Sequence, residues 1–285
     1  MKKLLLALLA FASTFAYSFN LDTLIHHFYK REEIVQDLPQ DPLTASIGII
    51  YITRNTNFYE IAPQIISAAK NQELHGIILI IDNNGGPIGT FSMMHDLIKK
   101  TSEKKPVIAW IVNEAQSGGY AIACSANYII ASRAAVIGSI GAIFEVWRYK
   151  EPKVMSNDLH AKTDVEIIKA GKFKSIFNAY SAPLTDFERE YLQDRINHFY
   201  QLFLMQVAQD RNLDLEDYKI WAEGQNFSGL EALELGLIDE IGTYFDVENK
   251  MIELLTKKFP SILFAQEINC ITYGNPTETV TPDMV

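Results

Sequence analysis

Three short apolar runs in the first half of the chain leave it few possible folds. They cover residues 47–52, 76–81 and 107–112, and amphipathic helical patterns at 58–70 and 90–100 separate them. A strand that is apolar throughout is typical of a sheet covered on both faces. Strands and helices in alternation therefore predict an α/β fold around a mostly parallel sheet. In such a sheet, ligands bind at the carboxyl ends of the strands.

Glycine-rich turns stand at two of those carboxyl ends. The second run is followed by Asp-Asn-Asn-Gly-Gly-Pro at 82–87, and the third leads into Ser117 and Gly118. Ser117 is therefore expected at a strand-to-helix turn, where unpaired backbone N–H groups favour negative charge. A serine in this place either attacks a carbonyl while the backbone stabilises the oxyanion, or simply caps an ordinary helix.

A nucleophilic serine needs a base, and the sequence offers two kinds. None of the six histidines stands in a glycine-rich turn, and we interpret those at 75, 95 and 198 as surface or packing residues. The other kind is a lysine kept neutral by burial, because desolvation can lower a lysine pKa by about 3–5 units. Lys169, Lys172 and Lys174 lie together among apolar residues, although a solvated charge cluster is the alternative interpretation.

Composition excludes several classes of function. The formal charge of the 285 residues is −10, which argues against a nucleic-acid partner because phosphate binding needs basic patches. The two cysteines, at 124 and 270, form no CxxC pattern, and neither HExxH nor an EF-hand loop is present. The sequence therefore predicts no metal site and no cofactor.

The ends of the chain differ in character from its middle. Residues 1–18 have two lysines, a short apolar run and small residues at 16 and 18, which is typical of a secretory signal that is either cleaved or kept as a membrane anchor. We therefore expect export, to the periplasm or the outer face of the cytoplasmic membrane. A linker with an amphipathic helical stripe is predicted at 19–44 and the main domain at 45–258. The remainder, 259–285, is expected to add a strand and then a disordered tail, since 271–285 is polar and Thr-rich.

The second half of the chain is predicted to be mainly helical. The pattern Thr-Asp-Phe-Glu at 185–188 is a capping box and predicts a helix start, with an apolar stripe continuing to about residue 211. The stripe consists of Leu192, Ile196, Phe199, Phe203 and Val207. Further helices are expected at 215–222, 229–235 and 247–257, and short strands at 128–131, 142–147 and 165–168.

Four motifs together resemble a known family. They are Ser-Gly-Gly-Tyr at 117–120, Gly-Ser-Ile-Gly at 138–141, Lys-Phe-Lys-Ser at 172–175 and Gly-Leu-Ile-Asp-Glu-Ile-Gly at 236–242. In this order, and over residues 46–255, they are similar to signal peptide peptidase A and its family of Ser–Lys peptidases, in the short form. The resemblance implies the crotonase and Clp protease fold, with repeated ββα units and a helical C-terminal part.

The resemblance also implies roles for five residues. It makes Ser117 the nucleophile and Lys174 the general base, with Ser139 orienting the lysine. It makes Gly86 and Gly118 the backbone N–H donors of an oxyanion hole. The expected substrates are membrane-associated peptides such as remnant signal peptides, and the expected assembly is a homo-oligomeric ring in which neighbouring subunits can complete the dyad.

The first glycine turn departs from the family pattern. The family usually has Asn-Ser-Pro-Gly-Gly there, whereas this chain has no proline before its glycines and carries Pro87 after them. Losing the proline loosens the turn, and Pro87 has no N–H. Two other functions therefore stay open: a catalytically impaired scaffold that binds envelope peptides, and a crotonase-like acyl-CoA enzyme that would use glutamates as acid and base.

Overall fold

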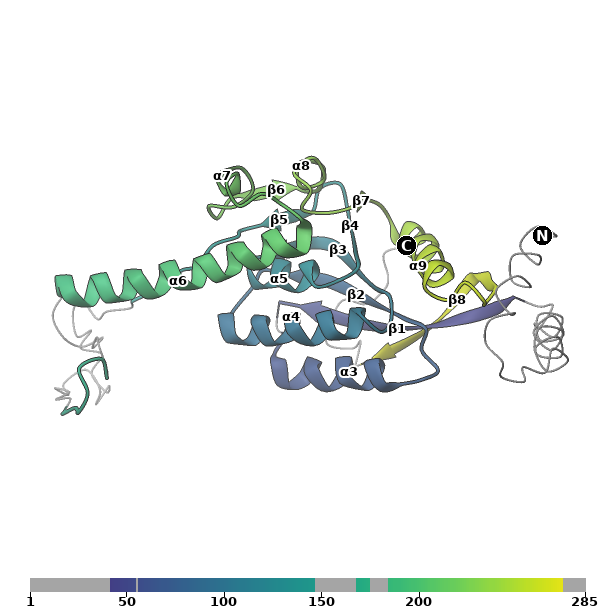
Figure 1. Ribbon diagram of the computed structural model, residues 1–285, viewed down its shortest axis with the longest axis horizontal. Helices are drawn as coiled ribbons and strands as arrows, with labels where there is room; N and C mark the ends of the chain where they lie inside the picture. The colour runs from purple at the N-terminus through teal and green to yellow at the C-terminus, as the bar shows by residue number, and fades with distance from the viewer. Residues whose placement is uncertain (1–41, 55, 147–167, 175–183, 274–285) are drawn as a thin grey trace, which may run out of the picture. The chain divides into compact units, whose positions relative to one another are not determined.

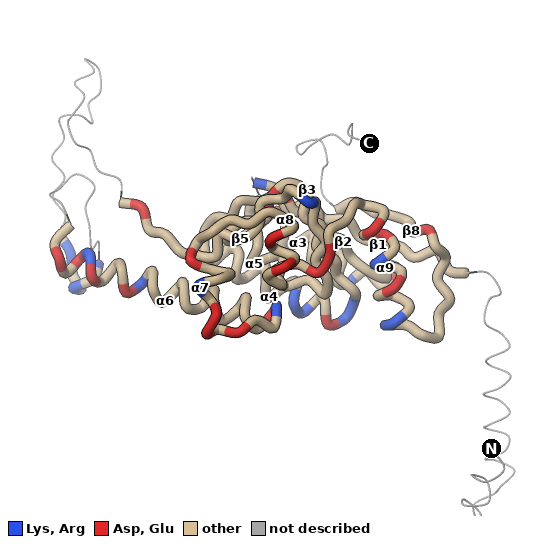
Figure 2. Tube along the Cα trace, turned by 90° about the horizontal axis from the view of Figure 1, so that it is seen from above, with Lys and Arg blue, Asp and Glu red and all other residues tan. Residues whose placement is uncertain are grey.

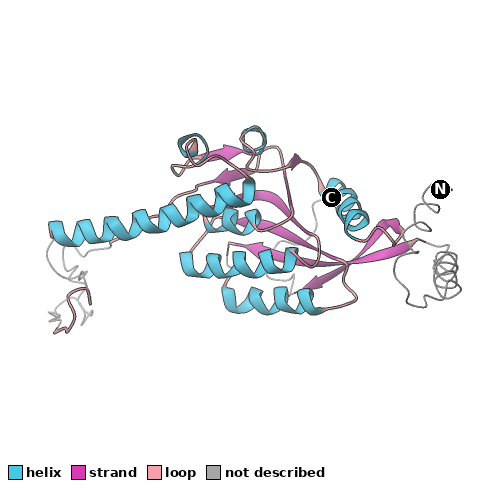
Figure 3. Ribbon diagram, viewed as in Figure 1, coloured by secondary structure: helices cyan, strands magenta, loops and turns pink. Residues whose placement is uncertain are grey.

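The apolar runs form neighbouring strands of one sheet (Figures 1 and 3). The computed structural model describes residues 42–54, 56–146, 168–174 and 184–273. Within these ranges the strands pair in the order β6-β5-β3-β2-β1-β8, and β4 joins β3 to β7. All pairs are parallel except β5 with β6, so the predicted α/β fold with a mostly parallel sheet is confirmed. The strands are β1 (Leu43–Thr53), β2 (Gly76–Asn83), β3 (Val107–Gln116), β4 (Tyr128–Ala131), β5 (Val136–Gly138), β6 (Asn226–Ser228), β7 (Glu240–Ile241) and β8 (Phe264–Tyr273).

Helices cover both faces of this sheet and create two apolar cores. Because side chains alternate along a strand, Ile50 and Ile52 of β1 face one core while Ile47 and Ile49 face the other. The larger core lies under α3, α4, α5 and the end of α6, and the smaller one lies under α9 (Figure 1). The helices are α3 (Phe58–Lys70), α4 (Ile88–Ser102), α5 (Gly118–Cys124), α6 (Asp186–Arg211), α7 (Tyr218–Trp221), α8 (Gly229–Glu234) and α9 (Tyr244–Lys258). In the described part of the chain, none of them has the length and apolar character needed to cross a membrane.

The longest helix, α6, begins where its capping box predicts but is buried only near its end. Thr185 accepts a hydrogen bond from the Glu188 N–H, and the Glu188 carboxylate accepts one from the Thr185 N–H. The predicted apolar stripe is confirmed only at its end, where Val207 is buried and Phe203 packs against the larger core, whereas Phe199 is 38% exposed. The earlier turns of α6 extend past the sheet and therefore cover no core.

Two strand predictions need correction. The described residues 142–146 form no strand, because the ladder between β3 and β5 ends at Gly138. The side chains of Ile143 and Phe144 are consequently exposed. Of the strand predicted at 165–168, only Ile168 lies within the described residues, and it is exposed and outside any strand.

The disorder predicted from residue 271 is wrong for residues 271–273, which belong to β8. Ile271 pairs with Gly48 and Tyr273 with Ile50 in a parallel ladder. The Tyr273 hydroxyl also accepts a hydrogen bond from Asn71 Nδ2 at 3.2 Å. Ile, Thr and Tyr are enriched in strands, and pairing with a strand that is already buried extends β8 to residue 273. The signal segment, the linker up to residue 41 and the tail from 274 lie outside the described residues.

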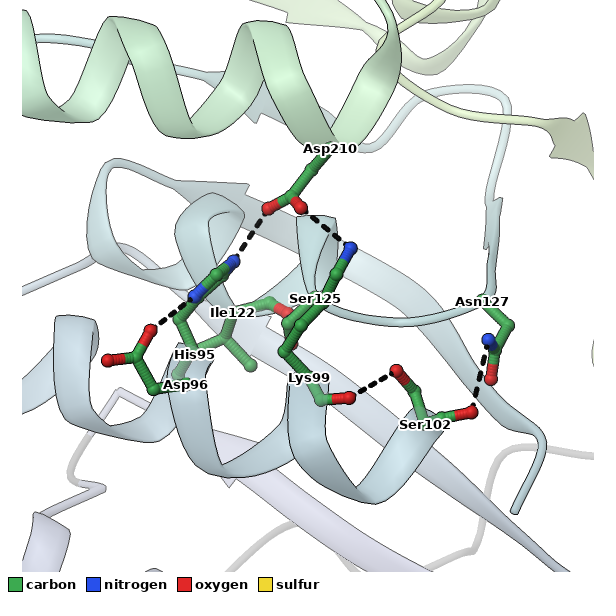
Figure 4. Close-up of polar contacts among 8 residues, drawn as sticks. All are labelled: His95, Asp96, Lys99, Ser102, Ile122, Ser125, Asn127 and Asp210. Atoms are coloured by element: carbon green, nitrogen blue, oxygen red, sulfur yellow. Dashed lines mark hydrogen bonds and ion pairs between the residues drawn. The ribbon is translucent and has the colours of Figure 1, made fainter. Parts of the chain in front are cut away.

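A buried ionic cluster attaches the end of α6 to α4 (Figure 4). Asp210 of α6 lies 2.6 Å from His95 Nε2 and 2.7 Å from Lys99 Nζ, and its side chain is only 4% exposed. Burial lowers the pKa of His95, but hydrogen bonds to Asp210 and Asp96 outweigh it and raise the pKa above its ordinary value. His95 is therefore a packing residue held between two carboxylates that favour its charged form.

Replacing His95 by Gln should weaken this attachment in a pH-dependent way. We expect the free energy of unfolding to fall by about 1.5–3 kcal/mol at mildly acidic pH, as for hydrogen bonds to charged groups. Because folding raises the pKa of His95, its contribution is complete below about pH 6.5 and is lost as the pH rises through the folded pKa. Denaturant unfolding at increasing pH should therefore show the two proteins converging.

The control is His198→Gln, which changes an exposed histidine of α6 outside the ionic cluster and should leave stability nearly unchanged. A deficit of His95→Gln that stays constant into alkaline pH would assign the effect to packing rather than to charge.

Candidate active site

Ser117 stands on a strained turn between β3 and α5. Its backbone has φ 49° and ψ −120°, a conformation that costs a non-glycine residue about 1–3 kcal/mol and that clusters at functional sites. Two hydrogen bonds hold the turn: the Ser117 N–H donates to the Gly138 carbonyl oxygen at 2.8 Å, and the Ala121 N–H donates to the Ser117 carbonyl oxygen at 3.0 Å. The hydroxyl makes no capping hydrogen bond to α5. The structure therefore does not use Ser117 as an ordinary helix cap, and its side chain stays partly exposed.

The register of the sheet brings the first glycine turn against Ser117. Ile81 of β2 pairs with Ile111 of β3, whereas Asn83 pairs with Ala115, so β3 gains two residues in a bulge before it ends. A Cβ on Gly85 would lie 2.8 Å from the Cβ of Ser117. The turn after β2 therefore touches the serine directly, which only a residue without a side chain allows.

The two expected oxyanion donors rest on one aromatic ring. A Cβ on Gly86 would lie 2.7 Å from the Phe91 ring, and a Cβ on Gly118 would lie 2.4 Å from the same ring. Gly85 and Gly86 have φ values of 104° and 156°, both in the region that favours glycine. The structure thus places Gly86, Gly118 and Ser117 side by side, and their catalytic roles stay predictions.

Ser139 lies beside Ser117 on the other flank. Gly138 pairs with Gln116 at the end of the β3–β5 ladder, and its carbonyl oxygen accepts the N–H of Ser117. Ser139 follows immediately with φ 49°, and its N–H donates to the Gln225 carbonyl oxygen at 2.7 Å. Both serines therefore occupy adjacent turns of the same sheet edge, each with a left-handed backbone.

Lys174 lies elsewhere in the chain. It is exposed, and its neighbour Phe173 stacks on Tyr191 of α6 with ring centroids 4.7 Å apart. Lys172 Nζ lies 4.3 Å from the centroid of the Phe187 ring, so the segment 168–174 contacts the first turns of α6. The burial of α6 begins thirteen residues after Tyr191, at Leu204, which at 1.5 Å per residue is about 20 Å along the helix. Lys174 therefore lies on a segment that packs against the exposed first turns of α6, away from the buried end of this helix.

The sequence pattern does not identify several residues that lie at this edge of the sheet. Phe91 looks like an ordinary apolar residue of α4, yet its ring lies against both Gly86 and Gly118. Glu114 of β3 is buried and lies 2.6 Å from Arg54 Nε, and its Oε2 accepts a hydrogen bond from Gln116 Nε2. In the described ranges no three His, Cys, Asp or Glu side chains gather as metal ligands would.

A strained serine beside backbone N–H groups at the carboxyl edge of an α/β sheet is the arrangement of enzymes that form acyl intermediates. Comparison with known proteins gives the family: residues 99–258, more than half of the chain, match the family model described as peptidase family S49. The chain therefore belongs to peptidase family S49, and the matches support a serine peptidase.

Two relatives illustrate how far the similarity extends. A protein of Methanocaldococcus jannaschii named as a protease is 31% identical over 68% of this chain and 60% of its own length. The chloroplastic serine protease SPPA of Arabidopsis thaliana is 32% identical over 64% of this chain and 26% of its own length. The chain thus spans less than two thirds of either relative.

Among solved structures, a membrane-bound stomatin-specific protease matches with a TM-score of 0.49 and 15% identity, covering 82% of this chain and 99% of its own. A member of the enoyl-CoA hydratase/isomerase family matches with a TM-score of 0.43 and 16% identity, covering 78% of this chain and 76% of its own.

Adding a methyl group at Gly119 should disrupt the contact between the two turns. A Cβ there would lie 2.3 Å from the backbone carbonyl oxygen of Asn83, which cannot move without shifting the end of β2. We expect Gly119→Ala to lower the free energy of unfolding by about 1–3 kcal/mol, in the range of overpacked cores. Thermal unfolding measures the change.

Gly89→Ala is the matched control. A Cβ at Gly89 would meet no atom within 4 Å, and the residue lies in the first turn of α4. This variant should be as stable as wild type, or slightly more stable, because alanine is favoured over glycine in helices. Equal stability of both variants would contradict the close contact at Gly119.

Proposed function

We propose that this chain is an exported serine endopeptidase that uses Ser117 and Lys174 as a dyad to cleave membrane-associated peptides such as remnant signal peptides. The observation that supports it most is the backbone of Ser117, whose φ of 49° holds the hydroxyl against two glycine turns. An ordinary helix cap does not require a strained backbone. A nucleophile does need its oxygen held beside N–H donors, and strained residues cluster at functional sites.

The proposed reaction follows from the groups at this edge. The amine of Lys174 accepts the hydroxyl proton of Ser117 as the Ser117 oxygen bonds to the carbonyl carbon of the peptide. The N–H groups of Gly86 and Gly118 donate to the oxygen on which negative charge develops. The tetrahedral intermediate then expels the amine, which takes the proton from the lysine. Water attacks the resulting ester by the same route and releases the acyl half.

In the proposed assembly, Lys174 reaches Ser117 of a neighbouring subunit. The separation of about 20 Å along α6 supports this arrangement, because the helix carries the lysine segment away from its own serine. Apolar side chains on α6 support it too: Phe199 is 38% exposed, Leu202 50% and Met205 55%. Interspersed acidic and basic residues mark the same helix (Figure 2). Such a mixed surface fits contact with another protein subunit.

Mixing two inactive variants tests the dyad and its location together. Ser117→Ala and Lys174→Ala should each abolish cleavage of a fluorogenic peptide. When the two are unfolded, mixed in equal amounts and reassembled, about a quarter of the sites should combine an intact serine with an intact lysine, because each site draws on two subunits at random. The mixture should therefore regain about a quarter of the wild-type rate.

The control is Lys172→Met, which removes a charge from the same segment but keeps the hydrocarbon contact with Phe187, and should retain most activity. Full activity of either single variant would contradict the dyad. Absence of labelling of Ser117 by a serine-reactive phosphonate in the assembled wild type would favour a peptide-binding scaffold instead.

Export is part of the proposal and has its own test. Mass spectrometry of the purified protein should find Phe19 as the first residue if the signal is removed after Ser18, or an intact N-terminus in the membrane fraction if it stays as an anchor. An intact N-terminus in the cytosolic fraction would contradict export.

A further inference from the structure

The last residue of β2, Asn83, is fully buried and uses both ends of its side chain. Its Nδ2 donates to the carbonyl oxygen of Thr53, the last residue of β1. Its Oδ1 accepts the N–H of Gly85 at 2.8 Å. A buried amide with both ends bound fixes the groups that bind it, because releasing either would leave a polar atom unpaired.

The bond from Gly85 to the Asn83 side chain closes an Asx turn. It fixes the peptide plane between Asn84 and Gly85, one residue before the plane that holds the Gly86 N–H. Only the two backbone dihedrals of Gly85 separate the two planes, and a Cβ on Gly85 would lie 2.8 Å from Ser117, so the fixed plane restricts where the Gly86 N–H can point. Neither Asn84 nor Gly85 restricts the backbone as a proline would, and both glycines of this turn have positive φ. The side chain of Asn83 therefore restrains this turn in the way that a proline ring would.

Asn83 also contacts the second donor turn. A Cβ on Gly119 would lie 2.3 Å from the Asn83 carbonyl oxygen and 2.9 Å from its Oδ1. The residue thus lies between the end of β1, its own glycine turn and the first turn of α5. One buried side chain joins the two segments that carry the donors.

We propose that Asn83 is a positioning residue for the oxyanion site. Its carboxamide sets the direction of the Gly86 N–H relative to Ser117 and Gly118. This inference rests on the proposed function, since it concerns the same oxyanion. The hydrogen bond from the Gly85 N–H to Asn83 Oδ1 orients the turn that carries the Gly86 N–H. The hydrogen bond from Asn83 Nδ2 to the Thr53 carbonyl oxygen anchors the side chain to the sheet. The two bonds should therefore affect different measurements.

Two substitutions separate these bonds. Asn83→Ala removes both, while Asn83→Ser keeps an oxygen that can accept the Gly85 N–H but is too short to hold the Thr53 carbonyl in the same way. For Asn83→Ala we expect kcat to fall about a hundredfold with KM nearly unchanged, as when an oxyanion donor is lost. The kcat of Asn83→Ser should be about tenfold higher than that of Asn83→Ala, or more. The melting temperatures of the two variants should nevertheless be similar.

A peptide aldehyde gives a second readout. It adds the Ser117 oxygen and places a tetrahedral oxyanion in the site, so its inhibition constant should weaken in parallel with kcat across wild type and both variants. A non-reactive peptide of the same sequence should bind all three equally. A merely structural role would lower the melting temperature without this selective loss.

Several outcomes would overturn the inference. One is an unchanged kcat in folded Asn83→Ala, and another is an equal loss of kcat in the alanine and serine variants. If Asn83→Ala does not fold, a hundredfold loss of kcat in folded Asn83→Ser would also overturn the inference. Failure of the proposed function looks different: wild-type cleavage would then survive Ser117→Ala, whatever the Asn83 variants do.

Discussion

The contact between two turns that have almost no side chains is the constraint on which the rest of this site depends. Gly85 lies against Ser117, and Gly119 lies against the backbone of Asn83, at distances that leave no room for a Cβ. Parallel pairing of β2 and β3 puts both turns at the same edge, and the bulge near their ends closes the remaining gap. Phe91 then fills the space beneath, so the two turns share one apolar support.

Much of this could be predicted from residue order alone. Apolar strands followed by glycine turns identify a parallel sheet and its carboxyl edge, and Ser117 follows from its place between strand and helix. The parts that could not be predicted depend on register. Phe91 looks like any apolar helical residue, and Asn83 like any turn former. Their roles arise only after pairing has decided which atoms face one another.

The wrong expectations share a physical cause, because local composition does not determine long-range partners. Residues 271–273 begin a segment that is mostly polar and Thr-rich, but they pair with the buried strand β1 and so become strand. Residues 142–146 are apolar except for Glu145, but they form no strand because the ladder between β3 and β5 ends at Gly138. The apolar stripe of α6 shows the same limit, since periodicity identifies a face without saying what covers it.

The two ends of α6 serve different purposes, and this makes the helix a rigid spacer in the proposed enzyme. Near its C-terminal end, Asp210 binds His95 and Lys99 in a buried cluster and fixes the direction of the helix. Near its other end, Tyr191 stacks on Phe173 and holds the lysine segment. A helix keeps its length, so α6 holds these two contacts apart. On this mechanism an isolated chain has a nucleophile and an oxyanion site but no base, and catalysis begins only when subunits meet.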